Sequence, residues 1–116
     1  DRAAHQLGMQ VSAIGPGSAT VTMPVRADML NGFAICHGGL VSTLADTAFA
    51  YACNAYDQLT VASGFAIDLL APSREGDVLT ARAQEVSRSR RTGPQPDRIG
   101  AQQAPARVTL HSPPGA

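Results

Sequence analysis

The junction between a His-Gly-Gly segment and a long helical run is the part of this sequence best suited to chemistry. His37, Gly38 and Gly39 precede Leu40–Tyr56, a run that contains neither Gly nor Pro. A helix over this run begins with backbone N–H groups that have no intrahelical partner, and its dipole adds partial positive charge at that end. Such an end suits an oxyanion or another anion. The segment therefore predicts an anion-stabilising helix terminus.

One carboxylate accompanies this terminus. Asp46 is the only charged residue of the run and follows Gly39 by seven residues (46 − 39 = 7). Seven residues are within about 20° of two full helical turns, so Asp46 and the Gly39 amide lie along the same side of the helix. The carboxylate could deprotonate a water for attack on a carbonyl, or attack directly and form an anhydride. The structural alternative is a cap on a neighbouring loop or a pair with an arginine.

Further polar residues could contribute to the same site. Asn31 lies six residues before His37 (37 − 31 = 6) and is either a turn residue or an amide that fixes a carbonyl or a water. For His37, a hydrogen bond that ties down the loop is favoured over acid or base chemistry. Arg88, Arg90 and Arg91 are either a solvated strand end or a cluster that meets phosphates near the site.

The rest of the sequence offers no competing motif. It contains no G-x-G-x-x-G, Walker A, G-x-S-x-G or C-x-x-C segment. Cys36 is adjacent to His37, but His5 and His111 are far away in sequence, so no metal site is predicted. The cysteines, Cys36 and Cys53, are expected to be free thiols in a reducing cytoplasm rather than a disulfide.

The predicted helix has two different faces. Its apolar residues recur at the spacing of a core-facing stripe. They are Leu40, Val41, Leu44, Ala45, Ala48, Phe49, Ala52 and Cys53. The other side is polar but small, without Lys, Arg or Glu, and consists of Ser42, Thr43, Asp46, Thr47, Ala50 and Asn54. A freely solvated face usually carries long charged side chains, so this one is expected to meet a second copy of the chain with Asp46 near the contact.

Short alternating segments predict a sheet for this helix. Leu7–Arg26 is typical of a hairpin about the turn Gly15–Ser18, and Pro24 should place its second strand at an edge or at a local bulge. Further strands are expected over Leu59–Leu70 and Val78–Ser87. The order strand, strand, helix, strand, strand predicts an α+β domain with one long helix against an antiparallel sheet.

Composition bounds the class of protein and the extent of the domain. The chain has 116 residues and a formal net charge of zero, which gives no reason to propose nucleic acid or an anionic membrane as a partner. No apolar run approaches the roughly 20 residues of a membrane span. A single domain is predicted over residues 1–91. Residues 92–116, rich in Pro, Gly, Gln and Ala, are predicted to be an irregular tail in which only Ala106–His111 could form a short strand.

The segment Asn31–Asn54 resembles the hotdog-fold acyl-CoA thioesterases, in particular the phenylacetate-degradation (PaaI) subgroup. The resemblance rests on Asn, five residues, His-Gly-Gly, and then Leu-Ala-Asp-Thr-Ala-Phe-Ala-Tyr-Ala-Cys-Asn. It continues more weakly over residues 17–30, 62–72 and 76–93. The family goes on into two further core strands where this chain has its tail. One hypothesis is that the tail is an out-of-frame reading of the C-terminal coding region, which resequencing of the gene would test.

The resemblance implies a hotdog fold, with a long central helix packed on a curved antiparallel sheet that lacks its last strands if the tail is genuine. It implies dimers, usually assembled as tetramers, with the active site between subunits. In that site Asp46 would be general base or nucleophile, Gly39 the oxyanion amide with Gly38 beside it, and Asn31 and His37 positioning groups. The implied reaction is hydrolysis of phenylacetyl-CoA or hydroxyphenylacetyl-CoA to free acid and CoA in the cytoplasm, with no cofactor beyond the CoA of the substrate.

Two other functions remain open. Hotdog domains also serve as acyl-CoA sensors or carriers without turnover, and the intact Asp46 and Gly39 favour an enzyme over such a binding protein. A hotdog dehydratase acting on acyl thioesters would use a His and a carboxylate in another arrangement, and hydration of an enoyl-CoA would reveal it.

Overall fold

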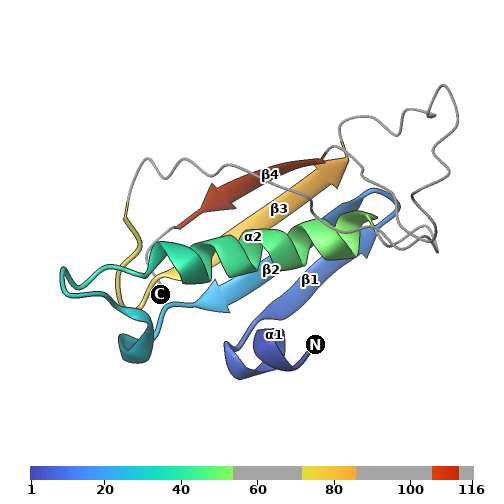
Figure 1. Cartoon of the computed structure of the whole chain (residues 1–116). Helices are drawn as coiled ribbons and strands as arrows, with labels where there is room; N and C mark the ends of the chain where they lie inside the picture. Colours follow the sequence, from blue (N-terminus) through green and yellow to red (C-terminus); the bar gives the residue numbers. More distant parts are fainter. Residues whose placement is uncertain (54–71, 86–105, 113–116) are drawn as a thin grey trace, which may run out of the picture.

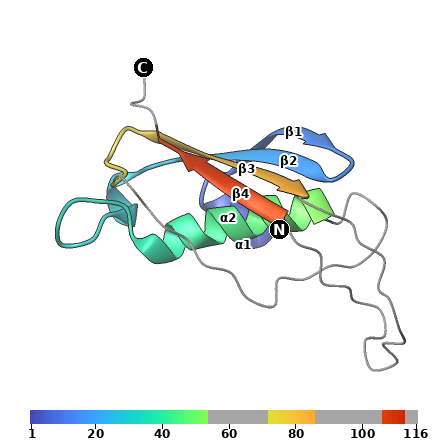
Figure 2. The ribbon, with the colours of Figure 1, turned by 90° about the horizontal axis from the view of Figure 1, so that it is seen from above.

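One long helix lies across one face of an antiparallel sheet (Figures 1 and 2). The computed structural model describes residues 1–53, 72–85 and 106–112. In these residues the sheet has four strands in the order β1-β2-β3-β4. The elements are α1 (Arg2–Gln6), β1 (Gln10–Gly15), β2 (Ser18–Pro24), the 3-10 turn η1 (Ala27–Met29), α2 (Gly38–Cys53), β3 (Val78–Glu85) and β4 (Ala106–His111). The predicted α+β architecture is confirmed.

The predicted hairpin forms, but its first strand starts at Gln10 rather than at Leu7. β1 and β2 are joined by a two-residue turn in which Gly17 has φ +74°, a conformation that favours glycine. The residues before the strand form α1 instead. The Asp1 carboxylate caps this helix by accepting two backbone N–H groups of its first turn at 3.0 and 3.2 Å.

Pro24 does not place β2 at an edge, and this corrects the prediction. β2 pairs with β1 on one side and with β3 on the other. Pro24 is the last residue of β2 and lies beyond Thr22, where pairing with β1 ends. The next N–H group, that of Val25, donates to the Asp77 carbonyl at 2.9 Å on the β3 side. Successive N–H groups of a strand point to opposite sides, so the missing N–H of Pro24 faces the side where β1 has already ended. The irregularity in pairing lies in β1 instead.

The alternation of β2 and β3 decides which face of the sheet packs on α2. Ala19, Val21 and Met23 of β2, and Leu79, Ala81 and Ala83 of β3, are buried and share a core with Val41, Leu44, Ala48 and Ala52 of α2. Many of these side chains are alanines, which keep the helix axis close to the sheet. Burial of this apolar stripe stabilises α2 far more than its helix propensity does.

Thr47 departs from the predicted division of α2 into two faces. Its side chain was expected on the polar side with Asp46, yet it is only 7% exposed. The Thr47 hydroxyl donates to the Thr43 carbonyl one turn earlier at 2.8 Å, so burial leaves this donor satisfied.

Several predictions fall outside the described residues. These include the strand Leu59–Leu70, the end of the strand beyond Glu85, and the cluster Arg88, Arg90 and Arg91. Within the segment predicted to be irregular, Ala106–His111 forms β4 and pairs with β3, so the one short strand that the sequence allowed there is present. The domain boundary at residue 91 stays a prediction.

The close approach of α2 to the sheet can be tested at Ala48, which is 0% exposed. Ala48→Leu forces extra methylene groups into a packed layer and should lower the free energy of unfolding by about 1–3 kcal/mol. Urea denaturation measures the change. Ala13→Leu, at an exposed position of β1, is the matched control and should stay within about 0.5 kcal/mol of the parent. Equal midpoints for both variants would contradict the packing described here.

Candidate active site

The two glycines of the His-Gly-Gly segment form the first turn of α2 rather than a loop before it. The His37 carbonyl accepts the N–H groups of Leu40 at 3.0 Å and Val41 at 3.2 Å, which starts the helical ladder. Gly38 and Gly39 carry the two N–H groups that come before these in the chain. Neither group has an acceptor in the part of the chain that the structure describes. These groups point out of the N-terminal end of the helix, as the predicted anion-stabilising terminus requires.

Nothing within the described residues requires glycine at these two positions. Neither Gly38 nor Gly39 has a positive φ, and a Cβ built on either meets no atom within 4 Å. A glycine in a helix lowers stability by roughly 0.5–1 kcal/mol relative to alanine. The missing side chains therefore keep two backbone donors open to a group that approaches from outside the chain.

Asn31 is a turn residue whose carboxamide is fixed in one orientation. Its Oδ1 accepts the N–H groups of Phe33 at 2.8 Å and Ile35 at 3.4 Å. Because both donors are backbone N–H groups, the oxygen is the atom that faces them, and the Nδ2 group points elsewhere. In the described ranges no acceptor is found for Nδ2. The two predicted roles of Asn31 are therefore compatible, since its oxygen holds the turn and its NH₂ group is left as a donor.

The loop that carries Asn31, residues 31–35, is closed by backbone hydrogen bonds. The Asn31 N–H donates to the Ile35 carbonyl at 2.8 Å, and the Ala34 N–H donates to the Asn31 carbonyl at 3.0 Å. Ala34 has φ +61°, an unusual backbone conformation for a residue other than glycine. Leu30 and Cys36 pair at the base of the loop. In Figures 1 and 2 the loop projects beyond the N-terminal end of α2.

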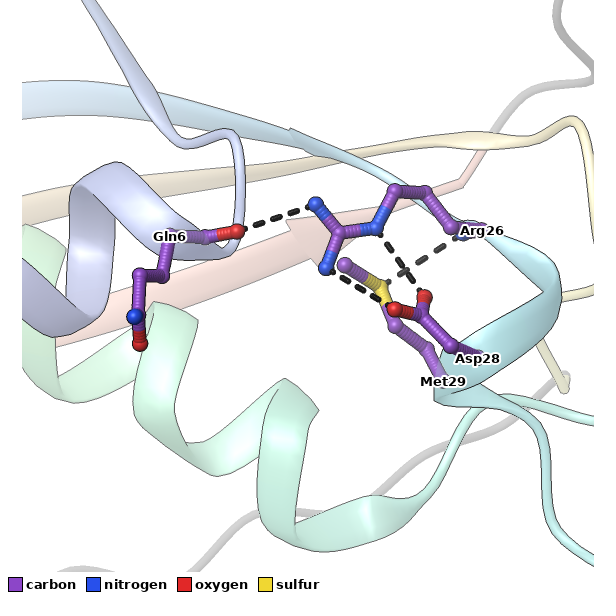
Figure 3. Close-up of polar contacts among 4 residues, drawn as sticks. All are labelled: Gln6, Arg26, Asp28 and Met29. Atoms are coloured by element: carbon purple, nitrogen blue, oxygen red, sulfur yellow. Dashed lines mark hydrogen bonds and ion pairs between the residues drawn. The ribbon is translucent and has the colours of Figure 1, made fainter.

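Arg26 fixes the corner from which this loop leaves β2 (Figure 3). Its guanidinium donates to the Gln6 carbonyl at the end of α1 at 2.9 Å and to the two carboxylate oxygens of Asp28 at 3.0 and 3.4 Å. The ion pair is well exposed, so its contribution to stability is within about 1 kcal/mol. Its value is geometric, because one side chain joins α1 to η1 directly before the loop.

The side chains of Asp46 and His37 have no hydrogen-bond partner among the described residues. Both residues are exposed, and the structural alternatives for Asp46, a loop cap or an arginine pair, find no partner among the described residues. The His37 contact that ties down the loop comes from the backbone, whose N–H donates to the Met29 carbonyl at 2.9 Å. The imidazole has no hydrogen-bond partner in residues 1–53, 72–85 and 106–112.

The surface of α2 between Gly39 and Asp46 is polar but internally satisfied. The Ser42 hydroxyl donates to the Gly38 carbonyl at 2.9 Å, and the Thr43 hydroxyl donates to the Gly39 carbonyl at 2.8 Å. Each hydroxyl is therefore turned back on the helix and needs no other acceptor. The short side chains leave a surface close to the helix backbone, which another molecule can approach without breaking hydrogen bonds.

Comparison with known proteins identifies the family. Residues 33–93 match the model of the thioesterase superfamily. The chain belongs to this superfamily. It is 50% identical over 93 residues to the acyl-coenzyme A thioesterase PaaI of Escherichia coli K12, which covers 80% of this chain and 66% of that protein. It is 35% identical over 92 residues to a putative esterase of Archaeoglobus fulgidus, which covers 79% of this chain and 60% of that protein.

Solved structures of similar proteins agree with this fold. The E. coli PaaI protein from the phenylacetic acid degradation operon has a TM-score of 0.81 at 41% identity, covering 97% of this chain and 73% of that one. A protein from Thermus thermophilus also has a TM-score of 0.81, at 38% identity, covering 97% of this chain and 86% of that one. The predicted hotdog fold and the resemblance to the PaaI subgroup are confirmed. This thioesterase-superfamily chain spans about two thirds or less of the length of the curated relatives it matches.

The superfamily match ends at residue 93, next to the position where the sequence turns into its Pro- and Gln-rich tail. No group of three or more His, Cys, Asp or Glu side chains that could hold a metal ion occurs among the described residues. No helix among them is long and apolar enough to cross a membrane.

Sequence reasoning did not single out two residues of the segment between β2 and α2, Arg26 and Phe33. The role of Arg26 was not predicted because its contact with Gln6 joins residues that are twenty positions apart in the sequence. Phe33 was not singled out because a large apolar residue is most often buried. In the structure this residue is 84% exposed. The one available signal was an aromatic residue directly after Asn31-Gly32, a typical turn dipeptide.

Asn31 provides a test that separates its two roles. Asn31→Asp keeps an acceptor for both backbone N–H groups but removes the NH₂ donor, so the free energy of unfolding should change by less than about 0.5 kcal/mol. Asn31→Ala removes the acceptor and should cost about 1–2 kcal/mol. Thermal denaturation of the two variants measures the difference. Equal destabilisation by both would mean that Oδ1 does not hold the loop.

Burial raises the pKa of the Cys36 thiol, so this cysteine is a poor nucleophile at neutral pH. The native protein should therefore be alkylated slowly at Cys36 by iodoacetamide, and quickly once unfolded, as peptide mass mapping would show.

The unfolded chain ionises the Cys36 thiol at a lower pH than the folded one, so the contribution of Cys36 to stability falls as pH rises above the pKa of the unfolded state. Cys36→Ala should flatten that alkaline decline, and an unchanged decline would contradict the assignment.

Proposed function

We propose that this chain hydrolyses acyl-CoA thioesters to the free acid and CoA, with phenylacetyl-CoA or hydroxyphenylacetyl-CoA as substrate. The observation that carries the proposal is the Gly38-Gly39 terminus of α2, followed on the same helix by the exposed carboxylate of Asp46, which has no partner among the described residues. The similarity to an acyl-coenzyme A thioesterase named PaaI supports the substrate class. The similarity to a protein of a phenylacetic acid degradation operon supports the acyl group.

The chemistry follows from the charge that develops on the substrate. Attack at the thioester carbonyl places negative charge on its oxygen, and an amide donor at the start of α2, with Gly39 as the candidate, stabilises that charge. Asp46 acts as general base on a water or as the nucleophile itself, and CoA leaves as the thiolate. The Asn31 Nδ2 group and His37 position the thioester or the water. Arg88, Arg90 and Arg91 are the candidates for the CoA phosphates.

The two catalytic groups of one copy are too far apart to act on one carbonyl. Gly39 and Asp46 are separated by about 10 Å along the axis of α2, at about 1.5 Å per residue. The Gly39 N–H points away from Asp46, out of the N-terminal end, so a bound oxygen lies farther still. A carboxylate must come within hydrogen-bond reach of the attacking water or of the carbonyl carbon. Each site therefore takes Gly39 from one subunit and Asp46 from another.

This requirement defines how two helices meet. In a two-fold dimer with antiparallel helices, residue i faces residue j with a constant sum i + j. Pairing 39 with 46 gives a sum of 85, which places the axis between Ser42 and Thr43. Those are the residues whose hydroxyls are turned back on the helix. The proposal is a cytoplasmic homodimer, assembled further into a tetramer, with two sites for each helix pair.

The direct test is release of free thiol from phenylacetyl-CoA. Asp46→Asn keeps the size of the side chain but removes the base, and should lower kcat by about 10²-fold or more. Circular dichroism confirms that the variant is folded. Equal rates for Asp46→Asn and the parent would sink the assignment, and tight binding of acyl-CoA without turnover by the parent would favour the non-catalytic binding protein.

The shared site can be tested by mixing two inactive variants. Gly39→Pro removes an N–H that has no acceptor within α2, and Asp46→Asn removes the carboxylate. A mixed dimer has one intact and one doubly impaired site, so an equimolar mixture that exchanges subunits should recover about a quarter of the parent activity. No recovery, after exchange has been shown by mass spectrometry, would mean that both groups act within one subunit.

A further inference from the structure

Phe33 is the most exposed large apolar side chain of the described residues, at 84%. The loop that presents it is rigid, because the Phe33 N–H is held by Asn31 Oδ1 at 2.8 Å and residues 31–35 are closed by backbone hydrogen bonds. An aromatic ring fixed outside the core in this way is typical of a contact surface.

We propose that Phe33 is an anchor between two copies of this chain, packed on the strip Phe49, Ala50 and Tyr51 of the partner's α2. The inference rests on the shared site proposed above, since it uses the register in which Gly39 meets Asp46 of the partner subunit. It adds a contact that the chemistry does not require. Two equivalent contacts form in each dimer, because a two-fold interface is self-complementary.

The register places the strip next to the loop. With the sum of 85, Gly38, the first residue of α2, lies level with residue 47 of the partner along the helix axis (85 − 38 = 47). The partner's residues 48–53 then extend beyond the start of α2 by about 9 Å, at about 1.5 Å per residue. The loop of residues 31–35 projects beyond that same end of α2 in both views (Figures 1 and 2). The overhanging end of one helix thus meets the loop of the other.

The strip has the chemistry that an aromatic ring needs. Ala50 is half-buried, Phe49 is half-buried and Tyr51 is 36% exposed. Neighbouring residues diverge by about 100° around a helix, so the two aromatic side chains flank the small Ala50. No charged residue occurs in α2 after Asp46. An offset or edge-on ring pair on such a strip is a favourable contact.

The exposure of Phe33 favours a second subunit over the substrate as its cover. A substrate would cover the ring only during turnover and leave it in water the rest of the time. A permanent partner keeps the ring out of water throughout. Because the loop is already held by hydrogen bonds, little further entropy is lost when the contact forms. A role in holding the acyl group is therefore the outcome that would replace this proposal.

Cross-linking tests the contact with Phe33 left in place. Gly32 is exposed and a Cβ there meets nothing within 4 Å, so Gly32→Cys is tolerated. Oxidation of Gly32→Cys/Ala50→Cys should give a covalent dimer, whereas the matched pair Gly32→Cys/Ile14→Cys, with Ile14 also exposed, should not. Equal yields, or none from the first pair, would overturn the proposal.

Dissociation of the assembly provides the second measurement. Phe33→Ala should raise the dimer dissociation constant about tenfold or more in sedimentation velocity, and Ile14→Ala should leave it unchanged. An unchanged constant, with or without a new acyl preference in kcat/KM, would overturn the inference. Recovery of activity in the mixed Gly39→Pro and Asp46→Asn dimers is independent of Phe33. If the cross-link fails but activity is recovered in the mixed dimers, only the Phe33 contact is ruled out. If the cross-link fails and no activity is recovered, the shared site is ruled out as well.

Discussion

Burial of one stripe of α2 against the sheet is the constraint on which the rest of the molecule depends. The alanines of the helix and of β3 keep the two layers close, and Leu44, Met23 and Leu79 fill the space between them. This contact fixes the rotation of α2 about its own axis. Once that rotation is set, Gly39 and Asp46 must face away from the sheet, because they lie on the opposite side of the helix. The position of the chemistry is thus a consequence of core packing.

Much of this arrangement could be predicted because it is local. The presence of α2 and the placing of Asp46 on its exposed side follow from helical periodicity, although α2 begins two residues earlier than predicted, and the hairpin follows from its turn residues. Pro24 was placed wrongly because a single strand does not reveal how far its neighbour extends. Thr47 was placed wrongly because its hydroxyl finds an acceptor within its own helix. Arg26 and Phe33 depend on contacts or exposure set by tertiary structure, which periodicity does not encode.

The site also shows how function departs from the most stable choice of residue. Two glycines in the first turn and a non-glycine residue at φ +61° each cost stability, and no atom near Gly38 or Gly39 in the described chain requires glycine there. The burial of the helix is strong enough to carry these costs. A catalytic surface can therefore be built from backbone donors and small side chains as long as the opposite face of the same helix stays well packed.

Asn31 gives the loop a property that bears on how such proteins diverge. The oxygen of its carboxamide holds the loop, and the nitrogen has no acceptor among the described residues. Selection for a folded loop therefore acts on the oxygen and places no constraint on the nitrogen. A descendant that exchanges this nitrogen for oxygen would remain folded while its donor is lost. Under the proposed function, such a descendant would keep the loop intact and lose the donor that positions the thioester or the water.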